Sequence, residues 1–211
     1  MSFVHIVTFP RSGHHAMIEQ LESVSDIYVN YCEYYNCIGR HGERIDCNKS
    51  NLIWKEKGFS CGAGRRIIKD HDFELLLPYS HGDKYIIQLR NPILSILSWY
   101  ELDSKNESLK LPDFKTYFRQ KMKFWVDFVE KWYPVISNSN VIYVPYENLA
   151  IKEKLIELAL FMDLPLKTDS LYDSTSFSIK RKEVKDDGFL GEEENKISSY
   201  LEKLGLEKVV I

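Results

Sequence analysis

Short apolar runs alternate with helical patterns along this chain, and this alternation restricts its possible folds more than any other feature. The runs are rich in β-branched and aromatic residues and cover residues 3–9, 66–69, 84–89 and 140–144. Between them, apolar residues recur at three- and four-residue spacing, as on the buried side of a helix. The pattern predicts an α/β fold with a mostly parallel central sheet flanked by helices. In such folds, ligands bind at the carboxyl ends of the strands.

The length of the chain fits one domain. The chain has 211 residues, and a domain takes roughly 150 residues, so we expect a single domain over residues 1–211. Residues 25–64 combine tyrosines, glycines, charges and all four cysteines without a clear period, which predicts an irregular, variable insertion there. The cysteines include no C-x-x-C pair, so we expect reduced thiols rather than a zinc site.

The balance of charges excludes broad classes of partner. The 28 lysines and arginines and the 31 aspartates and glutamates give a formal net charge of −3, which provides no general attraction to nucleic acid or to an anionic membrane. Residues 3–9 form the longest apolar stretch near the N-terminus and are too few for a membrane span or a signal sequence. We therefore expect a cytoplasmic protein in which any anion site is local.

The loop after the first apolar run has the composition of a phosphate site. Residues 10–15 read PRSGHH and lead into a helical pattern. Free backbone N–H groups and the positive end of the helix dipole favour a bound phosphate there, and an arginine adds a bidentate fork. The candidate ligands are Arg11, Ser12, Gly13, His14 and His15. The alternative is a tight turn with a solvated arginine, whereas ordinary ATP or GTP chemistry is disfavoured because the chain lacks Gly-Lys-Ser or Gly-Lys-Thr.

A second anion site is predicted after the run of residues 84–89. Arg90 stands at the end of this strand, directly before an Asn-Pro pair, and proline is favoured in the first turn of a helix. The helical pattern continues over residues 93–102, where Ser95 and Ser98 lie on a different face from the apolar stripe. Arg90 and Ser98 are candidates to bind a second phosphate, with close helix packing as the alternative reason for either serine.

At these positions the chain resembles the sulfotransferases that use 3′-phosphoadenosine 5′-phosphosulfate (PAPS). The family's loop for the 5′-phosphosulfate usually reads PKSGTT, and residues 10–15 are similar to it with Arg11 in place of the lysine. The family's 3′-phosphate site combines a strand-end arginine with a serine eight residues later, a spacing that Arg90 and Ser98 match. The resemblance implies a P-loop-like fold, PAPS as sulfuryl donor, adenosine 3′,5′-bisphosphate as product and no required metal.

The resemblance also supplies catalytic candidates after the run of residues 66–69. The segment Ile68-Lys69-Asp70-His71 is similar to the family's Lys-x-His element, in which the histidine is the catalytic base. A histidine suits that role because its pKa lies near neutrality. Lys69 is then expected to stabilise the sulfonate oxygens, and Arg11 fits the fixed cation that the leaving oxygen needs. The plainer alternatives are a surface or core histidine and a solvated lysine.

Three later segments match the family in the expected order. Residues 143–149 resemble its Tyr-Glu-Asp-Leu segment, residues 175–177 resemble a Thr-Ser-Phe stretch that contacts adenine, and residues 188–191 resemble its late Gly-x-x-Gly segment. The nucleotide contacts that this resemblance implies are Tyr146, Thr175 and Phe177.

Departures from the family pattern shift two of the expected contacts. The tryptophan that often follows the phosphate loop is Ala16 here, so more of the adenine stack is expected from Phe177. Asp186-Asp187 stands where the family has a late Arg-Lys pair, and carboxylates cannot bind a phosphate. The late clamp on the 3′-phosphate is therefore expected from Arg181 and Lys182.

These observations predict a PAPS-dependent sulfotransferase that acts on a hydroxyl, or less readily an amine, of an acceptor that the sequence does not identify. Two alternatives stay open. A small-molecule kinase on a related phosphate-loop fold would use the same strand-loop-helix site, although the missing Gly-Lys-Ser/Thr opposes it. A non-catalytic nucleotide-binding module would explain the lost tryptophan and the two aspartates, although the retained Lys69 and His71 oppose it.

Overall fold

A six-stranded sheet forms the centre of the computed structural model, which describes residues 2–45, 61, 64–168 and 188–204. The strands are β1 (Val4–Thr8), β2 (Tyr31–Glu33), β3 (Ile38–Gly39), β4 (Ile67–Asp70), β5 (Lys84–Leu89) and β6 (Val141–Pro145). Their order in the sheet is β3-β2-β4-β1-β5-β6, and all neighbours are parallel except β2 and β3. This arrangement confirms the α/β fold with a mostly parallel sheet.

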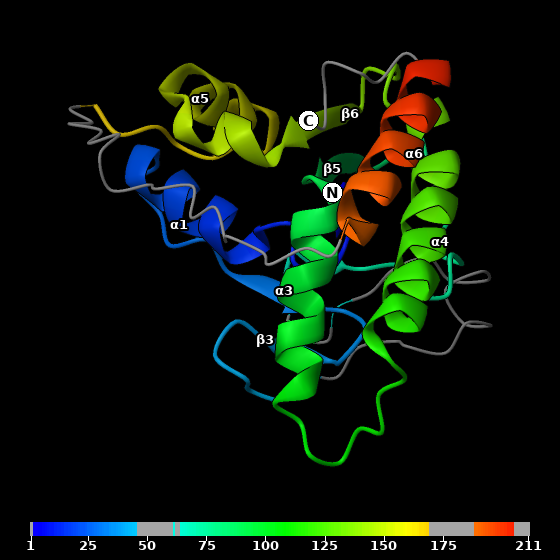
Figure 1. Ribbon diagram of the computed structural model, residues 1–211. Helices are drawn as coiled ribbons and strands as arrows, with labels where there is room; N and C mark the ends of the chain where they lie inside the picture. The colour runs from blue at the N-terminus through cyan, green and yellow to red at the C-terminus, as the bar shows by residue number, and fades with distance from the viewer. Residues whose placement is uncertain (1, 46–60, 62–63, 169–187, 205–211) are drawn as a thin grey trace.

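Helices cover both faces of this sheet (Figure 1). They are α1 (His14–Val24), α3 (Pro92–Ser104), α4 (Phe114–Trp132), α5 (Lys152–Phe161) and α6 (Phe189–Lys203), with 3-10 helices η1 (Tyr133–Val135) and η2 (Tyr146–Ala150). α1 and α5 pack on one face, and α3, α4 and α6 pack on the other. Within the described ranges, no helix has both the length and the apolar character needed to cross a membrane.

Side chains that alternate along the strands fill two apolar layers. On β5, Tyr85 and Ile87 belong to the layer on the α4 side, whereas Ile86 belongs to the layer on the α1 side. Aromatic residues of α4 build the first of these layers, and Trp125 and Trp132 are almost completely buried in it. Because β5 is buried on both faces, it reads in the sequence as a nearly continuous apolar run.

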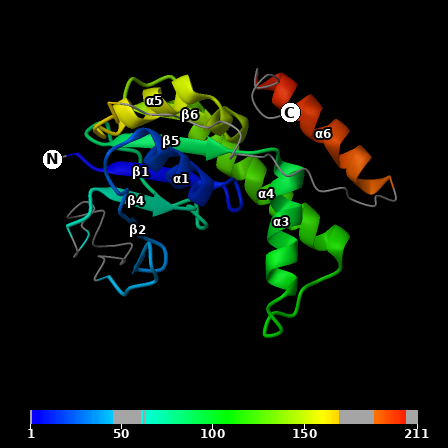
Figure 2. The same cartoon turned by 90° about the vertical axis from the view of Figure 1, so that its left-hand side faces the viewer.

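The centre of the sheet contains a point where the chain diverges. β1 and β5 are parallel neighbours, but β1 leads into α1 on one face and β5 leads into α3 and α4 on the other. Figure 2 shows α3 and its connection to α4 extending away from the sheet. In open parallel sheets, such a divergence leaves a crevice at the carboxyl ends of the strands where ligands bind. The two predicted phosphate sites follow these two strands.

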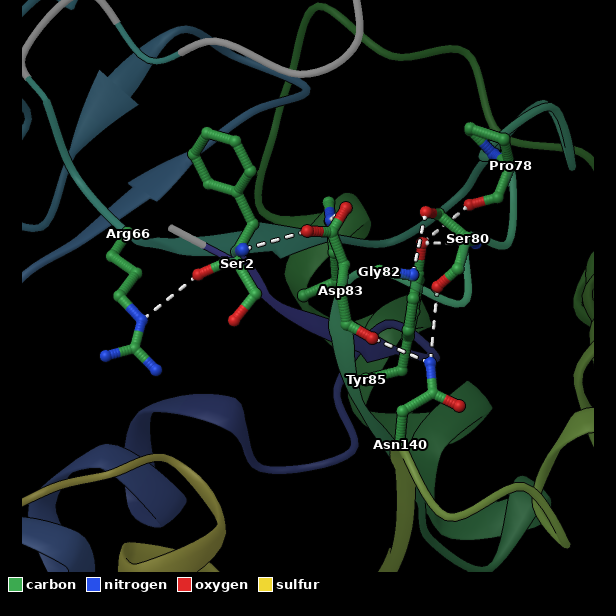
Figure 3. Close-up of polar contacts among 10 residues, drawn as sticks. Ser2, Arg66, Pro78, Ser80, Gly82, Asp83, Tyr85 and Asn140 are labelled. Carbon is green, nitrogen blue, oxygen red and sulfur yellow. Dashed lines mark hydrogen bonds and ion pairs between the residues drawn. The ribbon is translucent and has the colours of Figure 1, made fainter.

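A network of hydrogen bonds connects the amino ends of the strands, at the edge of the sheet opposite the predicted phosphate sites (Figure 3). Asp83 Oδ1 accepts a hydrogen bond from the Phe3 amide (2.9 Å), and Asn140 Nδ2 donates to the Asp83 carbonyl (2.7 Å). The Tyr85 hydroxyl donates to the Pro78 carbonyl (3.1 Å). These bonds connect the starts of β1, β5 and β6, so the strands that lead to the predicted site are fixed at their other end.

Two parts of the architecture differ from the sequence prediction. Residues 25–64, expected as an irregular insertion, contribute β2 and β3 to the sheet, while residues 46–60 and 62–63 lie outside the described residues. Helix α6 forms where the sequence showed only a Gly-x-x-Gly match. β2 and β3 have three and two residues, which are too few to show a period of two. The first turn of α6 contains Gly191, and glycine disfavours the interior of a helix.

Candidate active site

The loop after β1 is a tight turn that holds an arginine in a strained backbone conformation. The Ser12 amide donates to the Phe9 carbonyl (3.1 Å). Pro10 occupies the second position of this turn, and Arg11, at the third, has a φ of 66°. These features define a type II turn, whose third position favours glycine. A residue with a side chain loses about 1 to 2 kcal/mol there, and such strain is concentrated at functional sites.

Gly13 is the second left-handed residue of the loop and precedes the first turn of α1. Its φ is 89°, and a Cβ at this position would lie 2.3 Å from Cε2 of Tyr146. Glycine is favoured because the conformation disfavours a side chain and the Tyr146 ring leaves no space for one. No side chain caps the start of α1. The free N–H groups and the positive end of the helix dipole are therefore available to an anion.

Arg11 and Ser98, predicted to bind different phosphates, are in contact. Arg11 Nε donates a hydrogen bond to Ser98 Oγ on α3 (3.1 Å). Arg90 follows β5, and its guanidinium carbon lies 4.5 Å from the centroid of the Tyr146 ring. Ser95, by contrast, is fully buried. The structure thus brings both predicted phosphate sites together at the carboxyl ends of β1 and β5.

Buried donors near the carboxyl ends of β1 and β5 suit an anionic ligand. Ser12 Oγ, Arg90 Nε and Gln88 Nε2 are buried without a hydrogen-bond partner among the described residues. A buried polar group without a partner costs roughly 1 to 3 kcal/mol, so a ligand that pairs with these groups gains that free energy. Phosphate oxygens accept hydrogen bonds from arginine, hydroxyl and amide donors. The set of donors therefore suits a ligand with more than one phosphate.

His71 follows β4, and the backbone of β1 fixes the orientation of its ring. Nδ1 lies 2.8 Å from the Thr8 carbonyl oxygen, which can only accept, and 3.0 Å from the Thr8 hydroxyl oxygen, which can also accept. A ring protonated at Nδ1 satisfies both contacts. Nε2 of the neutral ring is then a proton acceptor, as a general base requires. Burial, together with the charge of Lys69, lowers the pKa of His71 to about 4. The rings of Tyr35 and Phe73 flank it, with centroids at 4.9 and 5.3 Å.

Lys69, near the end of β4, forms a buried ion pair with Glu33 of β2. Lys69 Nζ donates to Glu33 Oε1 at 2.6 Å, and the two residues are direct neighbours in the register of the strands. The Tyr35 hydroxyl donates to the other carboxylate oxygen (2.9 Å). Burial raises the pKa of Glu33, but the hydrogen bond and the charge of Lys69 outweigh it and hold this pKa below its usual value. The pair therefore keeps a fixed ammonium group beside His71.

The two histidines of the loop have different environments. His14 is buried and packs edge-on against Tyr31, with ring centroids 4.7 Å apart, and neither of its ring nitrogens has a partner among the described residues. Burial, with the charge of Lys69, holds the pKa of His14 well below its usual value. His15 is mostly exposed, and its Nε2 lies 3.9 Å from Glu33 Oε1. Of the two side chains, that of His15 is the more accessible to a ligand.

Comparison of the chain with known proteins identifies one family. A model of the sulfotransferase domain matches residues 3–200. The chain belongs to the sulfotransferase family. Sulfotransferase 1E1 of Rattus norvegicus is 26% identical to it over 188 residues, which make up 82% of this chain and 63% of that protein.

Two solved sulfotransferases share the fold at low sequence identity. The sulfotransferase from Alicyclobacillus acidocaldarius has a TM-score of 0.59 at 16% identity, with 99% of this chain and 95% of that chain covered. Mouse sulfotransferase SULT7A1, solved in complex with PAP, has a TM-score of 0.52 at 19% identity, with 83% and 62% covered. This chain therefore spans less than two thirds of the length of the rat and mouse relatives.

Several predicted site positions lie outside the described residues, and their assignments stay predictions. These positions are Thr175, Phe177, Arg181 and Lys182, with Cys47. The predicted Gly-x-x-Gly segment is described, and in it Gly188 precedes α6 while Phe189 and Leu190 pack into the core. Tyr146 is only 9% exposed, and its predicted contact with adenine also stays a prediction. In the described part of the chain, no three His, Cys, Asp or Glu side chains form a group that could hold a metal ion.

Two polar residues near the candidate site were not identified from the sequence. Gln88 interrupts the apolar run of residues 84–89, and a single polar residue within a strand buried on both faces is the signal that could have identified it. Glu33 stands in a tyrosine-rich segment without a period, and its partner Lys69 is 36 residues away. No local pattern indicates such a pair.

Proposed function

We propose that this sulfotransferase moves a sulfuryl group from PAPS to a hydroxyl, or less readily an amine, of its acceptor, with adenosine 3′,5′-bisphosphate as product. One observation supports the proposal most strongly. Two arginine sites lie together at the carboxyl ends of the neighbouring strands β1 and β5, and Arg11 is hydrogen-bonded to Ser98 there. A nucleotide with phosphate groups at both its 3′ and 5′ positions offers one anion to each site. A nucleoside triphosphate offers none at the 3′ position.

Each part of the donor has candidate contacts in the chain. In this proposal the loop and the start of α1 bind the 5′ end, and the residues after β5 bind the 3′-phosphate. The loop contacts are Arg11, Ser12, Gly13, His14 and His15, and the 3′-phosphate contacts are Arg90 and Ser98. The adenine contacts Tyr146, Thr175 and Phe177 and the late clamp of Arg181 and Lys182 rest on the family resemblance.

The chain's own residues supply the catalysis, and the proposal requires no metal ion. PAPS supplies a sulfuryl group on a phosphate leaving oxygen. The acceptor oxygen forms its bond to sulfur as the bond to this leaving oxygen breaks, and the bonding electron pair remains on the phosphate. His71 takes the acceptor's proton at Nε2, which the Thr8 contact leaves unprotonated. Arg11 and Lys69 stabilise the negative charge around sulfur, and one such donor is worth roughly 10² to 10³ in turnover.

Thermal denaturation with adenosine 3′,5′-bisphosphate, ATP and GTP in parallel tests the proposal. A ligand of the native state at a hundred times its dissociation constant adds about 2.7 kcal/mol of stability. We expect the bisphosphate to raise the melting temperature most. Preferential stabilisation by ATP would favour the kinase alternative. Binding of the bisphosphate without sulfation of any compound in an acceptor screen with labelled PAPS would favour a non-catalytic nucleotide-binding module.

The assignment of the 3′-phosphate site has a sharper test. Arg90→Ala should weaken binding of the bisphosphate much more than binding of adenosine 5′-phosphate, because a charge-assisted hydrogen bond is worth roughly 1.5 to 3 kcal/mol and only the bisphosphate can make it. Ser98→Ala should show the same selectivity with a smaller amplitude. Ser95→Ala is the matched control on the same helix and should show none. Equal weakening of both ligands in Arg90→Ala would refute the assignment.

A further inference from the structure

The register of the sheet brings Arg90 and Tyr146 next to each other. β5 and β6 are parallel neighbours in which Leu89 pairs with Pro145. The residues that follow each strand, Arg90 and Tyr146, therefore emerge side by side at the carboxyl edge. The distance of 4.5 Å from the guanidinium carbon to the centroid of the Tyr146 ring is within the range of a cation–π contact.

The same ring also supports the phosphate loop. A Cβ on Gly13 would lie 2.3 Å from Cε2 and 2.4 Å from Cδ2 of Tyr146, so the backbone of the loop lies directly against the edge of the ring. Tyr146 is 9% exposed and begins η2, which contacts both α1 and α5. The ring is thus held in place with the loop on its edge and Arg90 on its face.

Arg90 has few other contacts that could fix its position. Among the described residues its guanidinium has no hydrogen-bond or ion-pair partner, and its Nε is buried. Arg11, by comparison, is bonded to Ser98. An aromatic face attracts the charge of an arginine without using any of its N–H donors. The Tyr146 ring can therefore position Arg90 and leave its donors available for a ligand.

We infer that Tyr146 is a positioning residue that fixes Arg90 relative to the phosphate loop, so that the protein selects ligands whose two phosphate groups match that spacing. The inference rests on the proposed function, in which Arg90 binds the 3′-phosphate. It assigns this selectivity to the ring of Tyr146 and requires neither its hydroxyl nor a stack on adenine.

The test compares dissociation constants, measured by isothermal titration calorimetry, for adenosine 3′,5′-bisphosphate and adenosine 5′-phosphate. The ratio of the two constants reports the contribution of the 3′-phosphate. In Tyr146→Leu this preference for the bisphosphate should fall about tenfold, because Arg90 loses the face that positions it. Tyr146→Phe keeps the ring and should retain the preference of the unmodified protein. Arg90→Ala should lower the preference for the bisphosphate further. The double variant Arg90→Ala/Tyr146→Leu should show the same preference as Arg90→Ala alone.

Three results would overturn the inference. In the first, Tyr146→Leu weakens binding of both ligands equally. In the second, Tyr146→Leu lowers the preference by the same factor with and without Arg90. In the third, Tyr146→Phe loses the preference as well. If Tyr146→Leu melts below the measuring temperature, Tyr146→Met replaces it in both arms, because its longer side chain fills more of the space. The unmodified protein is measured before any variant. If it shows no preference for the bisphosphate, the proposed function is contradicted, and not only the inference about Tyr146.

Discussion

Gly13 and Gly188 share a backbone φ of 89° but have different surroundings. A residue other than glycine loses about 1 to 2 kcal/mol in this conformation. At Gly13 a Cβ also overlaps the Tyr146 ring, and overpacking of this kind adds about 1 to 3 kcal/mol. At Gly188, by contrast, no atom of the described residues lies within 4 Å of a Cβ. We expect Gly13→Ala to lose more free energy of unfolding than Gly188→Ala, measured by urea denaturation without ligand. Equal losses would show that the backbone conformation alone matters.

His71 is the residue on which the proposed proton transfer depends. A base must be unprotonated, and a pKa of about 4 keeps His71 unprotonated at neutral pH. Turnover should stay constant on acidification until the pH approaches that value. His71→Ala should lower turnover by roughly 10² to 10⁴ and leave the affinity for the bisphosphate nearly unchanged.

His14 and His15 provide the comparison for this prediction. Both stand at the start of α1, directly after the proposed phosphate loop, so His14→Ala and His15→Ala should weaken binding of the bisphosphate, measured by calorimetry. The proposed mechanism is wrong if His71→Ala keeps near-parental turnover while a loop variant loses turnover alone. The base would then lie in the loop.

At the scale of the elements, the Lys69–Glu33 ion pair joins β2 to β4. Both side chains are buried, and removal of one partner from a buried ion pair costs about 3 to 5 kcal/mol because the other charge stays uncompensated. Glu33→Gln and Lys69→Met should each lower the free energy of unfolding by that amount in urea denaturation. The double variant should recover most of the loss.

The Lys123–Asp127 pair on the surface of α4 is a matched control for this cycle. Its Nζ–Oδ2 distance is also 2.6 Å, but the side chain of Lys123 is 76% exposed. An exposed pair of this kind contributes about 0.2 to 1 kcal/mol, so the same cycle should give a much smaller coupling there. Simply additive losses at Glu33 and Lys69 would show that the two strands do not depend on the pair.

At the scale of the whole molecule, stability should decrease as the pH falls below neutrality. Burial lowers the pKa values of four histidines, which are His5, His14, His15 and His71. In the unfolded chain these groups bind protons near their ordinary value of 6.5. Below that pH the unfolded state binds more protons than the folded state, so the free energy of unfolding falls.

Asp70 has the opposite effect on the pH dependence of stability and provides an internal control. Burial raises its pKa to about 6 from the ordinary 3.8, so between these values the folded state binds the extra proton and acidification stabilises it. The four histidines outweigh this one group, and urea midpoints should be lower at about pH 5 than at about pH 7. Asp70→Asn removes the opposing contribution and should make the decrease steeper. A midpoint that rises on acidification would contradict the prediction.

The sequence by itself determined the fold class and supplied the candidate ligand-binding residues. Residues 84–89 were predicted as a strand and form β5, because burial on both faces leaves a nearly continuous apolar run. Arg11 and Arg90 stand directly after predicted strands, and the carboxyl ends of parallel strands share one edge of a sheet. The sequence therefore indicated that both arginines lie at the carboxyl edge of the sheet. Both indications depend on patterns within a few neighbouring residues.

Only the tertiary structure decided which side chains meet across the chain. Glu33 pairs with Lys69 because β2 lies beside β4, although the short β2 shows no period in the sequence. Tyr146 lies between Gly13 and Arg90 because β6 is paired with β5 in a register that aligns their ends. Strand order and register result from the packing of all the layers together, and no local pattern encodes them. The sequence thus contained the residues proposed to bind phosphate, whereas the spacing between them depends on the folded sheet.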